Sequence, residues 1–306
     1  MKHLLRPNIL PDEMGTAYLS FISQINAMSE TEIIRYAKTR STRTSPTTTF
    51  MAIADLAGIT YKGFIRSHSL KAFLDGFEER PDGHFPHGTK EEQRKREKVF
   101  PRDRKNALFC EQCAQEDLET CGRSYWRRTH QVPGICWCLK HKIPLLRAPL
   151  NDLIEQPHTL MEQALPCLEE PFPIYDSIEE RYIRVATKML EIHSPIYTGN
   201  LCGFISSACM SKSLTCHPFE WDKKLLSDVV LECCSYSWCN QLFETFSKKK
   251  PKEHFPEIDG CWIHIDNQAT TYALAMAILF ENQDYLSWVL SSSFRIPKNR
   301  KNNPRL

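Results

Sequence analysis

The sequence contains no long hydrophobic run. No stretch of about 18 consecutive apolar residues, the length that spans a membrane, occurs among its 306 residues. The N-terminus, MKHLLRPNILPDE, also lacks the apolar core of a signal peptide. We therefore predict a cytoplasmic protein with no membrane partner.

The sequence also lacks an excess of charge of either sign. Its 39 Lys and Arg residues and 37 Asp and Glu residues give a net charge of +2. This balance excludes nucleic-acid binding through a global basic field, so any such contact must come from local basic patches. Hydrophobic residues make up 42% and charged residues 25% of the chain, which is typical of a folded globular protein.

The common catalytic motifs are missing. We find no His-Glu-x2-His helix of metalloproteases, no deaminase zinc pattern, no nucleophile elbow and no glycine-rich phosphate loop. The sequence therefore predicts no enzyme and no catalytic residues.

Cysteine is plentiful, with 13 residues in the chain. An odd number without an export signal favours reduced thiols and metal ligands over a disulfide framework. Cys110-x2-Cys113 and Cys138-x2-His141 form two chelating pairs separated by 24 residues. Two such pairs predict one closed, structural Zn²⁺ site with no open position for a reacting water.

Other cysteines are predicted to be bystanders. Cys136 forms a Cys-x-Cys pair with Cys138, which is a poorer chelating geometry. Cys202, Cys209 and Cys216 recur every seven residues, and we assign them to a buried helical face because cysteine is among the most buried residue types.

Helical patterns dominate the rest of the chain. A Pro–Asp–Glu segment at 11–13 predicts a helix start, with an apolar stripe from Ala17 to Ile25 behind it. Further helices are predicted at 178–193, 202–213, 223–247 and 267–290. The expected fold is mainly α, with a short hairpin at the zinc knuckles.

A helix-turn-helix-like unit is predicted in TFMAIADLAGITYKGFIRSHSL, with Gly58 at the turn and Thr60 capping the second helix. If this unit reads DNA, its second helix would enter a major groove and present Lys62 and Arg66. The alternative is that the two helices form a simple hairpin with no role in DNA binding. Other candidate nucleic-acid contacts are Arg94, Lys95, Arg96, Lys98, Arg102, Arg104, Lys105, Arg127 and Arg128, although the run at 94–98 also fits a solvated helix of mixed charge.

Four regions follow from these patterns. We predict an N-terminal helical region with the helix-turn-helix-like unit at 1–100 and a zinc-knuckle, zinc-ribbon-like module at 101–148. A helical C-terminal domain at 149–294 and a disordered basic tail at 295–306 complete the chain.

The block FCEQCAQED…SYWRRTHQVPGICWCLKHKIPLL resembles the TniQ/TnsD family, the target-selection proteins of Tn7-like and CRISPR-associated transposons. The residues that match the family pattern are Cys110, Cys113, Tyr125, Trp126, Arg127, His130, Gln131, Pro133, Gly134, Cys138 and His141. Glu111, Leu139 and Lys142 replace the usual Pro, Pro and Gly of the knuckles. The resemblance covers 1–148 well and 220–290 faintly.

The resemblance implies a bacterial, non-catalytic protein that marks an insertion site and recruits an AAA+ ATPase regulator, which brings in the transposase. Some family members dock on an RNA-guided CRISPR effector (Cascade) with its guide RNA, and others read target DNA directly. We favour the adaptor because the chain is near neutral; direct DNA reading remains open, as does a homodimer. A zinc-finger transcription regulator is the rival from another class. Tyr125, Trp126, Pro133 and Gly134 are expected to form the structural core of the zinc module.

Overall fold

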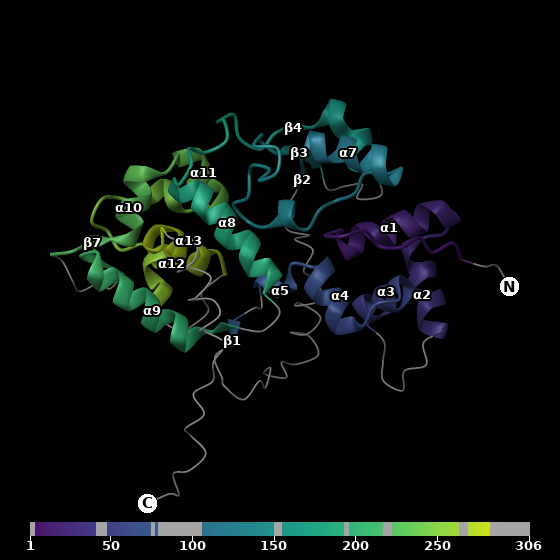
Figure 1. The fold of residues 1–306 in the computed structure, drawn as a ribbon, viewed down its shortest axis with the longest axis horizontal. Coiled ribbons are helices and arrows are strands. Elements are labelled where there is room, and N and C mark those ends of the chain that lie inside the picture. Colours follow the sequence, from purple (N-terminus) through teal and green to yellow (C-terminus); the bar gives the residue numbers. More distant parts are fainter. Residues whose placement is uncertain are drawn as a thin grey trace, which may run out of the picture. The chain divides into compact units, whose positions relative to one another are not determined.

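The fold is that of a computed structural model, which describes residues 4–40, 48–74, 77–78, 106–149, 155–192, 196–216, 222–262 and 269–281. The chain divides into two compact units (Figure 1). Unit 1 comprises Met1–Ala72 and Gly88–Pro173, and unit 2 comprises Phe73–His87 and Ile174–Leu306. The described part is mainly helical, as the sequence predicts. The four predicted regional boundaries stay predictions.

The elements of unit 1 are α1 (Gly15–Asn26), α2 (Glu30–Arg40), α3 (Thr49–Ala57), α4 (Tyr61–His68), α5 (Lys71–Leu74, at the unit boundary), β2 (Asn106–Phe109), α7 (Glu111–Cys121), η1 (Thr129–Gln131), β3 (Leu146–Pro149), η3 (Pro157–Gln163) and β4 (Leu165–Pro166). β2, β3 and β4 form a three-stranded sheet in that order, with both pairs antiparallel. Phe109 at the end of β2 is paired with Leu146 of β3. Cys110 directly follows β2, so the pairing of β2 with β3 fixes the position of its backbone.

Helices α1 to α4 enclose an apolar core that includes Tyr18, Ile22, Ile53 and Phe64. Gly15 permits the close packing of α1 on α4, because a Cβ at this position would lie 2.2 Å from the Phe64 ring. The sequence patterns did not identify this glycine, since only the tertiary contact makes its missing side chain necessary.

The predicted turn between α3 and α4 is present. Gly58 has a left-handed backbone with φ of 69°, and its N–H bonds back to α3. The hydroxyl of Thr60 accepts a hydrogen bond from the Gly63 N–H at 3.2 Å, so it caps α4 as expected. The geometry is that of two short helices at a tight turn; DNA reading by this unit stays a prediction.

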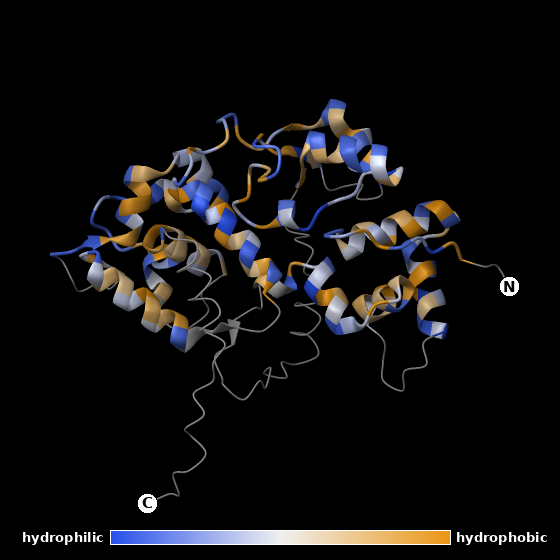
Figure 2. Ribbon diagram, in the orientation of Figure 1, coloured by the Kyte–Doolittle hydropathy of each residue, from blue (hydrophilic) through white to orange (hydrophobic). Residues whose placement is uncertain are grey.

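The elements of unit 2 are β1 (Phe77–Glu78), α8 (Ile178–Glu191), β5 (Ile196–Tyr197), α9 (Thr198–Ser211), β6 (Leu214–Thr215), β7 (Lys224–Leu225), α10 (Leu226–Cys233), α11 (Tyr236–Leu242), η4 (Phe246–Lys248), α12 (Pro256–Asp259), η5 (Gly260–Trp262) and α13 (Ala269–Leu279). β1 pairs with β5 and β6 with β7, both in parallel. α8 alternates polar and apolar residues around its axis (Figure 2), and it packs on α13, whose residues are all buried.

The prediction of one continuous helix at 223–247 is wrong, because the structure has two shorter helices there. The chain forms α10, breaks at Cys234 and restarts as α11, because the Ser235 hydroxyl caps α11 by accepting the Trp238 N–H at 3.2 Å. The helices predicted at 178–193 and 202–213 correspond to α8 and α9. Of the predicted helix at 267–290, the structure shows α13, which ends at Leu279; Phe280 and Glu281 are described and are not helical. The basic tail lies outside the described residues. None of the helices within the described ranges is long and apolar enough to cross a membrane.

Candidate metal centre

The first chelating pair lies where β2 meets α7. Cys110 is the residue before the helix, and the Ala114 N–H bonds to its carbonyl at 2.9 Å. Cys113 lies in the first turn of α7, so both thiols are near the positive end of the helix dipole, which favours thiolates. Both residues are buried. Because β2 leads directly into α7, the sulfurs of Cys110 and Cys113 face the same point.

The second pair lies in a tight turn from Cys138 to His141. The Lys142 N–H bonds to the Cys138 carbonyl at 2.9 Å, and the Cys138 N–H bonds to the Ile143 carbonyl at 2.9 Å. Lys142 closes this turn with a left-handed backbone, φ 58°. Glycine adopts this conformation without strain, which explains why the family pattern has glycine at this position. The ammonium of Lys142 lies 4.3 Å from the ring centre of Phe172, which is a cation–π contact.

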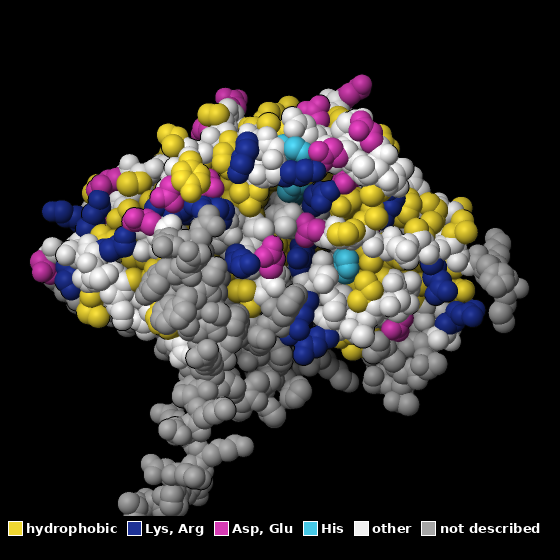
Figure 3. All heavy atoms as spheres, viewed as in Figure 1, with side chains coloured by type: hydrophobic (Ala, Val, Ile, Leu, Met, Phe, Trp, Pro, Cys, Tyr) yellow, Lys and Arg dark blue, Asp and Glu magenta, His cyan; other side chains and the backbone are white. Residues whose placement is uncertain are grey.

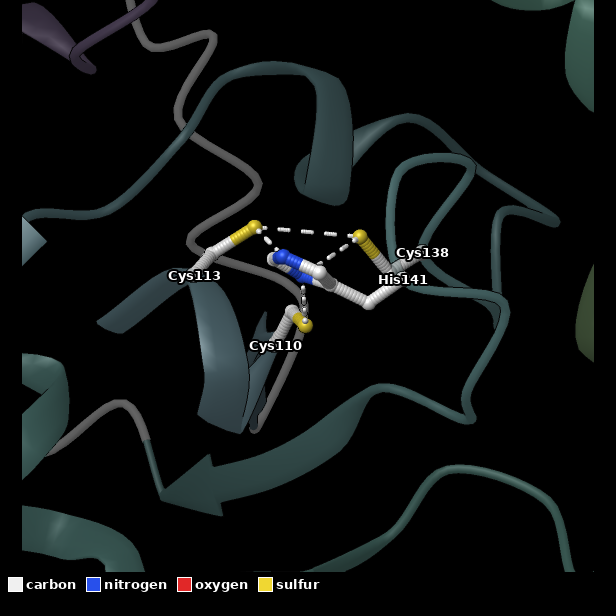
Figure 4. A group of neighbouring side chains, drawn as sticks. All are labelled: Cys110, Cys113, Cys138 and His141. Carbon is white, nitrogen blue, oxygen red and sulfur yellow. Dashed lines mark hydrogen bonds between the residues drawn. The ribbon is translucent and has the colours of Figure 1, made fainter. Parts of the chain in front are cut away.

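The four ligand atoms converge on one point (Figure 4) and lie within 4.8 Å of one another. The His141 Nδ1 is 3.2 Å from the Cys110 sulfur, 3.4 Å from the Cys113 sulfur and 3.7 Å from the Cys138 sulfur. The sulfurs of Cys113 and Cys138 are 3.7 Å apart. A tetrahedral zinc with ordinary bond lengths places two sulfurs about 3.8 Å apart and a sulfur and a nitrogen about 3.6 Å apart. The predicted donor set therefore fits a metal ion; its identity as Zn²⁺ remains our prediction.

The thiols of this cluster differ in their acidity. Hydrogen bonds to Cys110 and Cys138, together with burial, raise the pKa of Cys113. Hydrogen bonds from Cys110 and Cys113, and a further one from His130, lower the pKa of Cys138. Three sulfurs this close cannot all carry a negative charge alone, so one thiolate is favoured at the expense of the others. A divalent cation removes that conflict, which is the electrostatic reason for such a donor set to bind one.

The aromatic pair beside the centre, Tyr125 and Trp126, is buried, and its role as the structural core of the module stays a prediction. Trp126 packs edge-on against Phe109, with ring centres 5.7 Å apart, and its indole N–H donates to the Glu155 carbonyl at 3.0 Å. Gly134 has φ of 79°, so a left-handed turn requires it, and the neighbouring Pro133 is half-buried.

Gln131, one of the residues of the family pattern, has a supporting role that the sequence did not reveal. Its side-chain amide donates to the Leu108 carbonyl at 2.6 Å and accepts the Leu108 N–H at 3.1 Å. The amide thus acts as a strand partner for one residue of β2, two positions before Cys110. The family pattern contains Gln131 but does not show what its amide does, because the partner, Leu108, is 23 residues away.

The segment at 11–13 is the clearest correction. We predicted that Asp12 and Glu13 begin a helix, but α1 begins at Gly15 and has no acidic residue in its first turn. Glu13 instead forms a buried two-bond ion pair with Arg123, at 2.6 and 2.7 Å. Asp12 accepts from Arg128 at 3.1 Å and from the Thr129 hydroxyl at 2.6 Å. Arg123 and Arg128 are both buried, so loss of either carboxylate would leave a buried, unpaired positive charge, which is strongly destabilising.

The predicted nucleic-acid residues fall into three groups. Lys62 is exposed on α4, and Arg66 is half-buried. Arg128 is buried with Asp12, and Arg127 bonds to Asp117 at 2.6 Å, so both arginines already have carboxylate partners inside unit 1. The residues that lie outside the described ranges are Arg94, Lys95, Arg96, Lys98, Arg102, Arg104 and Lys105. Contact with nucleic acid stays untested for the whole set.

Cys202, Cys209 and Cys216 were predicted to face a core, and all three are buried. Within the described residues, the group around His141 is the one that gathers three or more potential ligands. Cys261 and His264 repeat the two-residue spacing, but His264 lies outside the described ranges.

Comparison with known families matches residues 4–145 of the chain to the TniQ family model. The matched range contains the N-terminal helices, the Asp12 and Glu13 contacts and all four ligands of the candidate metal centre. No curated protein matches the chain.

Proposed function

Residues 4–145 place this chain in the TniQ family, and on that premise we propose that it is a non-catalytic adaptor that docks on an RNA-guided CRISPR effector (Cascade). The family acts in the selection of transposition targets and works with the transposition machinery, and that general role carries over to this chain. In the proposal, the bound adaptor marks the insertion site and recruits the AAA+ ATPase regulator, which brings in the transposase.

The observation that carries the proposal is that two arginines of the zinc-knuckle module, Arg127 and Arg128, already have carboxylate partners within the protein. Direct readers of DNA need Lys and Arg side chains that are free to contact phosphates and bases. Arg127 and Arg128 instead form ion pairs with Asp117 and Asp12, respectively. On the face shown in Figure 3, Lys and Arg side chains are interspersed with Asp and Glu, in keeping with the net charge of +2. Delegating sequence recognition to a guide RNA suits such a surface.

Direct DNA reading is the second candidate, and the α3–α4 pair favours it. The two helices meet at Gly58, Thr60 caps α4, and Lys62 is exposed on α4. In this alternative, α4 enters a major groove and the chain acts as a TnsD-like selector.

Selection from randomised DNA duplexes at physiological salt, followed by a salt titration, separates the two candidates. The adaptor predicts weak binding without a sequence motif, which is lost as salt rises because only phosphates are contacted. Enrichment of one motif would establish direct reading and overturn the adaptor. The Lys62→Gln variant should then lose the motif, whereas Lys248→Gln, an exposed lysine of unit 2, should keep it.

A binding assay with the effector tests the adaptor positively. The purified full chain is mixed with guide-loaded Cascade and, separately, with Cascade and the AAA+ ATPase. We expect a stable complex with the effector and a ternary complex with the ATPase. The absence of any complex with the effector would contradict the proposal.

A further inference from the structure

The far side of the His141 ring faces a carboxylate that the metal centre does not use as a ligand. The Glu116 Oε1 lies 3.0 Å from the His141 Nε2. The Nδ1 of the same ring faces the three sulfurs. We propose that Glu116 is a positioning residue of the metal centre, which holds His141 in the orientation and tautomer that binds the ion. This inference does not rest on the proposed role in transposition.

The chemistry follows from the two ring nitrogens. A neutral imidazole carries one N–H, and its other nitrogen holds the lone pair that binds a metal. When the Nε2–H donates to Glu116, the Nδ1 lone pair is left facing the sulfurs. Carboxylates commonly fix metal-bound histidines in this way and increase their basicity.

The position of Glu116 on α7 makes the contact possible. Glu116 is three residues after Cys113, so both side chains lie on the same face of the helix. His141 belongs to the second knuckle, in a turn 25 residues further along. Glu116 therefore links the second chelating pair to the helix that carries the first.

Lys140 provides the competing explanation, because its ammonium also contacts Glu116. Glu116 would then belong only to a surface ion pair. The side chains of Lys140 and Glu116 are 62% and 42% exposed, and exposed pairs of this kind contribute little to stability. The side chain of His141 is only 10% exposed, so its contact with Glu116 is the more shielded of the two.

The test compares four variants of the full-length protein, Glu116→Ala, Glu116→Gln, Lys140→Met and Glu119→Ala. Glu119 is the matched control, since it is exposed on the same helix and bonds only to Gln115 in the described structure, at 2.8 Å. The measurements are Zn²⁺ affinity by competition with a chromophoric chelator and the visible absorption spectrum of the Co²⁺-loaded protein. The spectrum reports on the ligand geometry, which a purely structural role of Glu116 would not change.

We expect Glu116→Ala to lower Zn²⁺ affinity about 10-fold to 100-fold and to alter the Co²⁺ spectrum. Glu116→Gln keeps an acceptor oxygen and should recover part of the affinity, which also covers the case in which the alanine variant does not fold. Lys140→Met and Glu119→Ala should stay within about twofold of the parent.

Two results would overturn the proposal. One is a parental affinity and spectrum in both Glu116 variants. The other is a loss in Lys140→Met as large as that in Glu116→Ala, which would assign Glu116 to the surface ion pair. Neither result depends on DNA or effector binding, so failure of this proposal and failure of the adaptor proposal are distinguishable.

Discussion

The interiors of the two units differ in what organises them. Both units bury an ion pair, Glu13 with Arg123 in unit 1 and Lys249 with Asp228 in unit 2. Unit 1 in addition gathers three thiols and an imidazole around one point, whereas unit 2 is organised around α13, an apolar helix whose eleven residues are all buried. The cysteines show the same contrast, because those at knuckle spacing converge in unit 1, whereas Cys202 and Cys209 of α9 are buried core residues in unit 2. We therefore expect the stability of unit 1 to depend more on its metal centre, and that of unit 2 more on the apolar residues buried around α13.

Removal of the predicted zinc ion should produce the largest difference between the units. A structural zinc site supplies its binding free energy, about 10–16 kcal/mol in zinc-finger peptides, directly to folding. We expect Cys113→Ser, or a chelator, to abolish hydrogen-exchange protection in β2 and α7 while protection in α13 remains. Cys121→Ser, at an exposed cysteine, is the control. Equal loss of protection in both units would show that they do not unfold separately.

Breaking the buried ion pair should have the next largest effect. Glu13→Ala leaves the Arg123 guanidinium buried and unpaired, which costs about 3–5 kcal/mol. We expect this loss in chemical denaturation of unit 1, and a smaller loss in the double variant Glu13→Leu/Arg123→Met, because no charge is then stranded. Glu162→Gln, at an exposed position of η3, should be neutral. If the double variant is as unstable as the single one, the pairing argument is wrong.

A cavity in α13 should affect only unit 2. Leu274 is fully buried, and Leu274→Ala should reduce stability by about 2–5 kcal/mol through lost apolar burial and the cavity left behind. Hydrogen exchange in α8 and α13 measures the effect. Met210→Ala serves as the comparison, since Met210 is 66% exposed and should change stability by less than about 0.5 kcal/mol. A similar loss of protection in α7 would contradict the separation of the two units.

The smallest expected effect concerns the knuckle turn at Lys142. Lys142→Gly and Lys142→Ala both remove the contact with Phe172, but only glycine adopts the left-handed backbone without strain. The glycine variant should therefore be more stable than the alanine variant by about 1 kcal/mol, measured by thermal unfolding. The order should reverse at Lys140, which is not among the residues with positive φ. Equal stability of the two Lys142 variants would show that the turn rearranges.

The candidate site was predictable wherever its signal is local. The two-residue gaps at Cys110–Cys113 and Cys138–His141 are visible in the sequence, because each pair chelates within a single turn. The turn at Gly58 and the cap at Thr60 were equally predictable, since the few residues around them determine both. The predicted helix at 223–247 failed because the hydroxyl of Ser235 ends one helix and begins another, a competition that apolar periodicity does not reveal.

The sequence by itself determined the donor set, the mainly helical class and the family resemblance. Tertiary structure alone decided the partners of Asp12 and Glu13, the strand-like role of Gln131, the need for glycine at 15 and the contact of Glu116 with His141. The physical reason is the range of each interaction. Chelation and capping act within a few residues, whereas a buried charge pairs with whichever opposite charge the fold brings close, here 110 residues away for Glu13 and Arg123.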